Sequence, residues 1–375
     1  MKFRINRVEL LSNLNKVAKA VNSKTPLLAL TGIKFTLTDN YLELIGSDSD
    51  LSIRCIISKE KNNQKIIEVE EIGSIVINEK IICDIVRKME SEMIEIAVID
   101  NLAKIKSDKA IFSVNCIPAI DYPPITFNDI ADGQTFSIDA LELKNLFDQT
   151  LFATSDKESR PVLTGLNFKC SDNVLEVGAT DTFRLSRKVI RLQESVEFNV
   201  TIPRNALDDV NKIVELGQTV HVTISDKKVA FDLGDCVVNT RVINGTYPDI
   251  AKLIPVEFSQ TLNISTKELV GAVDRASILL TEKSNVVKLN MDTDEVFVSS
   301  KSMEVGYVVE KLNDYSYEGE SLTISFSAKF LLDALKALAS EEISLHFTGE
   351  MKPIVVKSKT NPDLTELILP VRSFN

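Results

Sequence analysis

The sequence predicts an α+β protein made of three repeated domains, and the first observation behind this prediction is internal repetition. Thr31–Arg54 reads TGIKFTLTDNYLELIGSDSDLSIR, and Thr164–Arg187 reads TGLNFKCSDNVLEVGATDTFRLSR. The two segments align without a gap and share Thr, Gly, Phe, Asp-Asn, Leu-Glu, a later Asp and the closing Arg. A weaker third copy begins near Val287, where Leu289-Asn290 falls on Leu166-Asn167. Repetition at a fixed period is typical of a chain built from copies of one structural unit.

The second observation is the even spacing of the helices that the sequence predicts. Apolar residues recur at helical period after six polar or charged positions, which are Asn6, Asn78, Asp139, Arg204, Ser265 and Ser327. Three of them have the spacing of a capping box: Asn6 with Glu9, Asp139 with Glu142, and Ser265 with Glu268. The six starts divide the chain into segments of similar length. Each domain is therefore predicted to contain two similar halves with one helix each.

Short alternating apolar segments predict strands in the remainder of each half. The clearest are Ile33–Leu37, Tyr41–Ile45, Leu51–Ile56, Val220–Ile224 and Val229–Leu233. Proline-rich turns with a shared pattern, Asp121-Tyr122-Pro123-Pro124 and Thr246-Tyr247-Pro248-Asp249, mark the domain junctions. We expect domains at residues 1–127, 128–255 and 256–375.

Composition indicates a globular protein. Apolar residues make up 44% of the 375 residues and charged residues 26%, and no apolar run approaches the length of a membrane-spanning helix. The first residues, MKFRINRVELL, do not have the pattern of a signal peptide, so we expect a cytoplasmic protein with no membrane partner. The net charge of −11, taken alone, argues against nucleic-acid binding but gives no information on how charge is distributed.

Cysteine and histidine are sparse. The five cysteines, Cys55, Cys83, Cys116, Cys170 and Cys236, are scattered without a close pair, and we expect them to be buried, reduced thiols. The two histidines, His221 and His346, each lie in a strand-like run. We therefore expect no metal site, no cofactor and no histidine base.

An enzymatic alternative rests on carboxylates in the repeat. Asp48 and Asp50, with Asp181 at the equivalent place in the second copy, could suggest a metal-dependent phosphoryl hydrolase. No phosphate-binding loop or other catalytic motif accompanies them. Ser and Asp at strand ends are also typical of turns, and we favour that interpretation, with no catalytic residues.

Several motifs along the whole chain resemble those of the bacterial DNA polymerase III beta subunit, the sliding clamp family. They are the MKF start, LTGIKF, GSDSDLSI, SRPVLTG, ATDTFRL, NGTYPD, SFSAKFLLDALKAL and the LILPVR near the end. The resemblance implies three clamp domains, each of two βαβββ units, which form half of a ring with helices inside and sheets outside. It implies a non-catalytic processivity factor that encircles duplex DNA without reading its sequence and tethers a polymerase.

The resemblance also implies partners and their sites. The expected partners are double-stranded DNA, a second copy joined head to tail, the polymerase III catalytic subunit, the clamp-loader complex, and other polymerases and repair proteins that carry clamp-binding peptides. DNA should be held loosely through phosphate contacts. The candidate DNA-binding residues are Lys24, Lys157, Arg160 and Arg204, with Lys80 added by its position on a helix after Glu79.

A peptide pocket is implied between the second and third domains, and a dimer contact between the first and third. The pocket residues carried over are Leu163, Thr180, Thr182, Phe183, Arg184, Leu185, Pro255, Leu367, Leu369, Pro370, Val371 and Arg372. Phe183 is expected to make the pocket floor more aromatic, and the tail Ser373-Phe374-Asn375 to cover part of the pocket. The dimer residues are Lys80, Ile81, Ile278 and Leu279.

Overall fold

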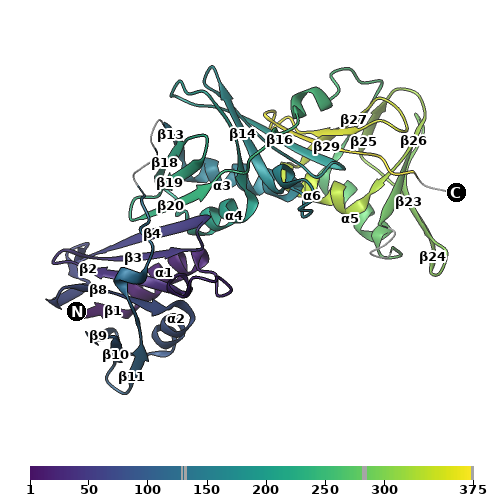
Figure 1. The fold of residues 1–375 in the computed structure, drawn as a ribbon. Helices are drawn as coiled ribbons and strands as arrows, with labels where there is room; N and C mark the ends of the chain where they lie inside the picture. The colour runs from purple at the N-terminus through teal and green to yellow at the C-terminus, as the bar shows by residue number, and fades with distance from the viewer. Residues whose placement is uncertain (128–129, 131–132, 281–284, 373–375) are drawn as a thin grey trace. The chain divides into compact units, whose positions relative to one another are not determined.

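The computed structural model describes residues 1–375 except 128–129, 131–132, 281–284 and 373–375. In this part of the chain, six βαβββ units follow one another (Figure 1). Each predicted helix is present and begins at the predicted position or directly after it. The helices are α1 (Arg7–Val17), α2 (Glu79–Lys88), α3 (Ala140–Thr150), α4 (Arg204–Ile213), α5 (Thr266–Ser277) and α6 (Ala328–Leu338).

The strands of the six units repeat the same order around each helix. The first pair of units has β1 (Lys2–Asn6), β2 (Gly32–Leu37), β3 (Tyr41–Ser47) and β4 (Leu51–Ser58), then β8 (Gly73–Asn78), β9 (Met93–Ile99), β10 (Leu102–Lys106) and β11 (Ile111–Asn115). The second has β13 (Gln134–Asp139), β14 (Gly165–Ser171), β15 (Val174–Thr180) and β16 (Arg184–Arg191), then β17 (Phe198–Pro203), β18 (Thr219–Ile224), β19 (Lys228–Asp232) and β20 (Cys236–Arg241). The third has β21 (Gln260–Ser265), β22 (Val286–Met291), β23 (Val296–Ser302) and β24 (Gly306–Lys311), then β26 (Leu322–Ser327), β27 (Glu342–Phe347), β28 (Ile354–Lys357) and β29 (Leu364–Ile368).

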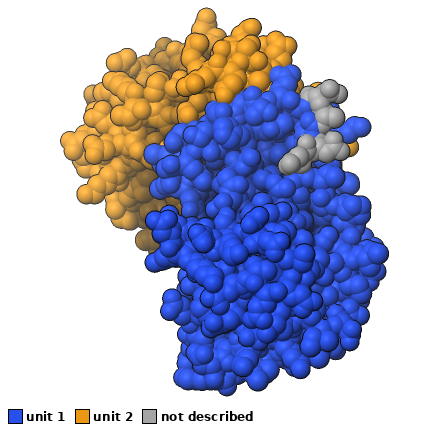
Figure 2. Space-filling view, turned by 90° about the vertical axis from the view of Figure 1, so that its left-hand side faces the viewer, with its two compact units in different colours: residues 1–141, 209–242 blue, residues 142–208, 243–375 orange. Residues whose placement is uncertain are grey.

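Two compact units arise from the way these strands pair. Unit 1 comprises residues 1–141 and 209–242, and unit 2 comprises residues 142–208 and 243–375, as coloured in Figure 2. In unit 1 a nine-stranded sheet has the order β12-β8-β2-β3-β4-β20-β19-β18-β13, where β12 is Ile117–Pro118. In unit 2 a second nine-stranded sheet has the order β17-β14-β15-β16-β29-β28-β27-β21-β25, where β25 is Tyr315–Glu318.

A smaller sheet completes each unit. Unit 1 has the five-stranded order β11-β10-β9-β1-β7, with β7 at Ile67–Glu71, and unit 2 has the four-stranded order β24-β23-β22-β26. Helices α1 and α2 pack together in unit 1, and α5 and α6 pack together in unit 2. The core beneath α5 and α6 is apolar, with Leu269, Leu331 and Phe326 buried in one cluster. No helix among the described residues is long and apolar enough to cross a membrane.

The predicted capping boxes at Asn6 and Ser265 are not complete in the structure. Asn6 Oδ1 accepts hydrogen bonds from the N–H groups of Val8 and Glu9 at 3.0 and 3.1 Å, as an N-cap residue should. The Glu9 carboxylate is paired with Lys61 instead of returning to Asn6. At Ser265 the side chain makes no capping bond to the described first turn of α5. Helix position was therefore predicted correctly from these pairs, although the reciprocal bond of the box is not the reason.

The residues shared by the repeats have structural causes. Gly32 and Gly165 each begin a strand where an added Cβ would lie 2.8 Å from the carbonyl oxygen of Ile77 and 2.3 Å from that of Ile202. A side chain at either position would force the paired strands apart. The preceding threonine hydroxyls, for example that of Thr164 to Pro161 O at 2.7 Å, close the short 3₁₀ turn before each strand. Thr-Gly recurs because the same turn leads into equivalent interior strands, β2 and β14, of the two nine-stranded sheets.

The prediction of five reduced cysteines is wrong for one pair. Strands β4 and β20 pair so that Cys55 and Cys236 lie opposite each other, and they form a disulfide across 181 residues of sequence. Cys83 and Cys170 are buried free thiols and Cys116 is partly buried. Burial raises the pKa of Cys83 to about 12, with Glu79 adding to the effect. The pair escaped sequence analysis because only strand pairing brings two such distant positions together.

Candidate functional site

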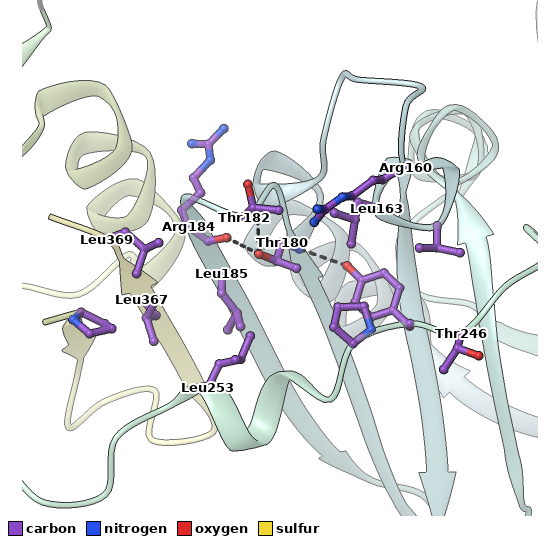
Figure 3. Close-up of a pocket in the computed structure, with 14 residues that line it drawn as sticks. Arg160, Leu163, Thr180, Thr182, Arg184, Leu185, Thr246, Leu253, Leu367 and Leu369 are labelled. Atoms are coloured by element: carbon purple, nitrogen blue, oxygen red, sulfur yellow. Dashed lines mark hydrogen bonds between the residues drawn. The ribbon is translucent and has the colours of Figure 1, made fainter. Parts of the chain in front are cut away.

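The main candidate site is an apolar cavity of about 640 Å³ within unit 2. Leu367 of β29 and the adjacent Leu369 lie on one side, and Leu163 and Arg160 lie on the other (Figure 3). Leu185 of β16 lies between them, above Leu253 of the 3₁₀ helix η6 (Ile250–Leu253). Such a cavity, apolar with few polar groups, suits aliphatic and aromatic side chains of a peptide.

A tight turn between β15 and β16 supplies the polar edge of the cavity. The Asp181 carboxylate accepts hydrogen bonds from the N–H groups of Phe183 and Arg184 at 2.8 and 2.9 Å. Thr182, at φ 78°, lies at the tip of this turn. The Phe183 carbonyl accepts a bond from the Leu369 N–H at 2.9 Å, which fixes Leu369 against the cavity. The turn thus exposes backbone and hydroxyl groups beside an apolar wall.

Arg184 stabilises the β15–β16 turn through contacts outside the cavity. Its guanidinium points away from the cavity (Figure 3). It donates to Asp333 at 2.5 Å and to the Phe152 carbonyl at 2.7 Å. It also stacks on Phe330, with its guanidinium carbon 4.5 Å from the ring centroid. Arg184 is therefore a positioning residue for the turn and for β29, and only its aliphatic part is available to the cavity.

Two buried titratable groups belong to the surroundings of the site: Tyr247 lines the cavity, and Glu366 precedes the lining residue Leu367 on β29. The Tyr247 hydroxyl accepts a bond from the Thr180 N–H at 3.0 Å, and burial raises the pKa of the Tyr247 phenol. Glu366 on β29 is 1% exposed, and burial raises its pKa well above the usual value. Ser186 Oγ lies 2.7 Å from Gln149 O and 2.8 Å from Glu366 Oε1. A hydroxyl has one proton, so both contacts are satisfied when Glu366 is protonated and donates to Ser186.

Seven of the twelve residues carried over to the pocket line the cavity: Leu163, Thr180, Thr182, Arg184, Leu185, Leu367 and Leu369. Pro255, Pro370, Val371 and Arg372 are not among its lining residues. Phe183 is not among them either: its side chain is 54% exposed, with Lys157 Nζ 6.0 Å from the ring centroid. The aromatic side chain of the lining is Tyr247 instead. The tail Ser373-Phe374-Asn375 lies outside the described residues.

Sequence analysis did not assign six lining residues to the pocket: Val162, Thr246, Tyr247, Pro248, Leu253 and Pro353. Three of them belong to the turn Thr246-Tyr247-Pro248, which was interpreted only as a domain junction. Arg160, taken as a DNA candidate, also lines the cavity. The Tyr-Pro pattern, present at both domain junctions, was the available sequence signal for these residues. A pattern that recurs at both junctions can indicate side chains that pack against the adjacent sheet.

The candidate DNA-binding residues differ in their surroundings. Lys24, Lys80, Lys157 and Arg160 are exposed. Arg204 at the start of α4 is paired with Asp156 at 3.1 Å and with Asp208 at 3.5 Å, so part of its charge is neutralised within the chain. The other four are more available to a phosphate than Arg204 is.

The expected dimer residues, Lys80, Ile81, Ile278 and Leu279, lie in or beside helices α2 and α5, and Lys80 is exposed. Ile278, directly after α5, is 77% exposed, and Ile81 in α2 is 44% exposed, while Leu279 is partly buried. Two sheet edges carry further exposed apolar residues. They are Ile111 and Phe112 on β11, and Tyr307 and Val309 on β24. Sequence analysis missed these edges because a single alternating strand does not reveal whether it lies inside a sheet or at its edge.

Two carboxylates of the enzymatic alternative, Asp48 and Asp181, accept hydrogen bonds within turns, and the third, Asp50, is paired with Arg241 at 3.4 Å. Asp48 Oδ1 accepts from the N–H groups of Asp50 and Leu51 at 3.0 and 2.7 Å, which repeats the pattern of Asp181. The described residues contain no group of three or more His, Cys, Asp or Glu side chains that could hold a metal ion. The turn interpretation therefore accounts for why Asp recurs in both copies.

Comparison with known families covers nearly the whole chain. Residues 1–126 match the model of the DNA polymerase III beta subunit N-terminal domain, residues 137–249 that of its central domain, and residues 251–372 that of its C-terminal domain. The "Beta sliding clamp" of Bacillus subtilis is 39% identical over 380 residues, and that of Staphylococcus aureus is 35% identical over 378 residues, with 100% of both chains covered in each case.

Solved structures give the same result. A DNA polymerase sliding clamp from Bacillus subtilis superposes with a TM-score of 0.95 at 38% identity, covering 100% of both chains. The beta chain of DNA polymerase III from Streptococcus pneumoniae superposes with a TM-score of 0.94 at 30% identity, covering 99% of this chain and 100% of that one.

Proposed function

The chain belongs to the DNA polymerase III beta subunit family, the beta sliding clamps, and from this membership we propose that it is a processivity factor of the replicative polymerase. The observation that carries the proposal is the full-length match to clamps in both sequence and fold. The protein acts on DNA and with a polymerase but performs no chemistry itself. A tether of this kind raises the local concentration of polymerase at the template. Its place of work is the cytoplasm, where a bacterial chromosome lies.

The finer proposal is a ring of two copies that encircles duplex DNA. Each copy contributes three domains, at residues 1–127, 128–255 and 256–375, with helices facing the DNA and sheets outside. Edge strand β11 of one copy meets edge strand β24 of the other, close to the expected contacts Lys80, Ile81, Ile278 and Leu279. Exposed edge strands with apolar residues favour pairing with a strand of another copy. Head-to-tail contacts form a closed ring when the rotation that relates neighbouring copies adds up to a full turn.

Retention on DNA tests the ring. Labelled protein is loaded onto nicked circular plasmid by a compatible clamp loader with ATP, and the mixture is separated by gel filtration before and after the plasmid is linearised. We expect the protein to remain with the circle and to leave the linear DNA, because a ring is held by topology. Retention on both forms would indicate ordinary affinity. Retention on neither, with an active loader, would contradict the clamp function.

We further propose that the unit 2 cavity binds clamp-binding peptides of the polymerase catalytic subunit, the clamp loader and repair proteins. Leu369→Ala removes an apolar wall group that the Phe183 carbonyl holds in place. We expect a labelled peptide from the polymerase catalytic subunit to bind about tenfold more weakly, equivalent to ~1.4 kcal/mol.

Fluorescence anisotropy measures the change, and Val256→Ala, at a residue 89% exposed and outside the cavity, is the matched control. Sedimentation should show the same dimer in both variants. Unchanged peptide affinity in Leu369→Ala would show that the peptide binds elsewhere.

A further inference from the structure

Two cavities in unit 1 share a wall, and positively charged side chains line both of them. The shared wall is formed by residues 123–126. The first cavity, of about 240 Å³, has Lys228 and Arg241 in its lining. The second, of about 530 Å³, has Lys34 and Arg54. Each pair of cations therefore lies in a concave place where a ligand can be enclosed.

Strand alternation places the two cavities on the same face of the nine-stranded sheet. Ile45 lines the second cavity and Ser47 the first, and these residues are two positions apart on β3. Arg54 and Ser52 have the same relation on β4. Side chains two positions apart on a strand point to the same face of a sheet, so one extended ligand can reach both cavities.

The first cavity brings two like charges together. Lys228 on β19 lies directly opposite Arg241 on β20. Side chains at opposed positions of antiparallel strands have Cβ atoms about 5 Å apart, and like charges there repel each other. Asp50 pairs with Arg241 at 3.4 Å, but the two side chains are 76% and 64% exposed, which makes the pair weak. Lys228 has no ion pair with any residue that the structure describes, so one positive charge is not neutralised.

The second cavity has the same balance of charge. Lys34 Nζ lies 5.9 Å from the centroid of the Tyr122 ring, and the Arg54 guanidinium carbon lies 5.1 Å from that of Phe127. These contacts hold the two cations at the cavity. Within the described chain neither cation forms an ion pair, and Glu43 is the one carboxylate in the lining. Each cavity thus has two cations and one carboxylate.

An anion in the cavities can contact these cations directly. The Arg241 side chain is 64% exposed, and Lys34, Arg54 and Lys228 are partly exposed. The whole chain has a net charge of −11, so an excess of positive charge in two adjoining cavities is a local exception. Such a place attracts anions that the net charge of the protein repels.

The size of the excess indicates the kind of anion. One carboxylate neutralises the one unbalanced positive charge of each cavity, whereas a phosphate monoester carries nearly two negative charges. Pro123, Pro124 and Ile125 give the shared wall apolar groups, which suit the methylene groups of a glutamate side chain. Two carboxylates on one peptide therefore match two cavities with a common wall.

We propose that the two cavities form a docking site for an acidic peptide segment of a partner protein. Lys228 and Arg241 hold one carboxylate of the segment, and Lys34 and Arg54 hold another. The methylene groups of the acidic side chains lie against residues 123–126. A partner can engage this site independently of the apolar cavity in unit 2.

Methyl NMR on the full-length protein, labelled at isoleucine, tests the proposal with an acetylated and amidated peptide of six glutamates. The salt concentration is about 0.15 M, which screens attraction between distant charges. We expect saturable shifts of the methyl signals of Ile125, which lines both cavities, and Ile45, which lines the second. The matched peptide of six glutamines has the same length and no charge, and it should give no saturable shift.

Variants make the test specific. We expect the dissociation constant to rise about threefold in Lys228→Gln and about tenfold in the double variant Lys228→Gln with Arg54→Gln, because partly exposed ion pairs each contribute modestly. Lys228→Gln removes one member of a repelling pair, so it should not disturb folding. Lys104→Gln, the same change at an exposed position of β10 outside both cavities, should leave the affinity unchanged.

Four results would overturn the proposal. They are no saturable shift with the glutamate peptide, equal binding of the glutamine peptide, unchanged affinity in the double variant, and tighter binding of inorganic phosphate or of a thymidine oligonucleotide of six nucleotides. The last result would assign the cavities to phosphate groups instead of carboxylates. None of these bears on retention of the protein on circular DNA, so the clamp function is tested separately.

Discussion

At Glu366, burial decides the charge state and thereby the pH dependence of stability. The folded-state pKa is raised above the usual 4.5, with burial as the main cause, while Ser186 and Arg184 act in the opposite direction. Between 4.5 and the raised pKa, the unfolded chain has released this proton and the folded chain has kept it. Folding then takes up a proton, so the contribution of Glu366 to stability decreases as pH rises through that window.

Glu366→Gln tests this charge state, because glutamine has nearly the same shape and no proton to release. We expect the free energy of unfolding of the variant, relative to the unmodified protein, to increase as pH rises above 4.5, the ordinary pKa of a glutamate side chain. Urea unfolding at several pH values measures it. A difference that stays constant with pH would mean that Glu366 is ionised in the folded protein.

The roles of some single residues could be predicted from the sequence, and those of others could not. Asp48 and Asp181 were correctly interpreted as turn residues, because a short carboxylate is well suited to accept the N–H groups two and three positions ahead. The roles of Arg184 and Glu366 could not be predicted. Both depend on groups from distant segments, Asp333 and Ser186, that meet only in the folded sheet.

At the level of elements, the pairing of β4 with β20 joins segments that sequence analysis assigned to different domains. The Cys55–Cys236 disulfide adds a covalent link to this pairing, and its two cysteines are 0% and 2% exposed. A cross-link over 181 residues restricts the unfolded chain strongly. Its burial keeps the pair out of contact with solvent.

Thiol counting tests the disulfide. In denaturant, we expect three reactive thiols without reductant and five after reduction. The double variant Cys55→Ser with Cys236→Ser should lose about 2–4 kcal/mol of stability, measured by urea unfolding. The matched single variant Cys170→Ser, at a buried free thiol, controls for loss of a buried sulfur. Five reactive thiols before reduction would contradict the cross-link.

The helices illustrate what local sequence specifies. N-cap residues such as Asn6 and Asn78 position each helix through bonds to its own first turn, so their effect is visible in a short window. The order of strands in a sheet is not local. β16 pairs with β29, the last strand of the chain, and periodicity carries no signal for that pairing.

At the scale of the whole molecule, ring closure should depend on the exposed edge of β24. Tyr307 and Val309 are 78% and 58% exposed there. In the double variant Tyr307→Glu with Val309→Glu, we expect buried carboxylates to prevent association between copies. Sedimentation velocity should then show a monomer, and the protein should no longer be retained on circular DNA.

Leu216→Glu, at a residue 66% exposed in a turn of unit 1, provides the control for added charge and should remain a dimer. A dimer in the β24 variant would place the contact between copies elsewhere.

The sequence by itself determined the repeated α+β architecture, the six helices and the family. Helix caps, apolar periodicity and family motifs each depend on residues close together in the sequence, so they can be recognised without the tertiary structure. Seven of the residues that the family resemblance assigned to a pocket line the unit 2 cavity, whose role in peptide binding stays a proposal. Only the tertiary structure decided the Cys55–Cys236 pair, the burial of Glu366 and the exposed sheet edges. Each of these depends on which strands become neighbours, and the free energy of that choice comes from contacts between residues far apart in sequence.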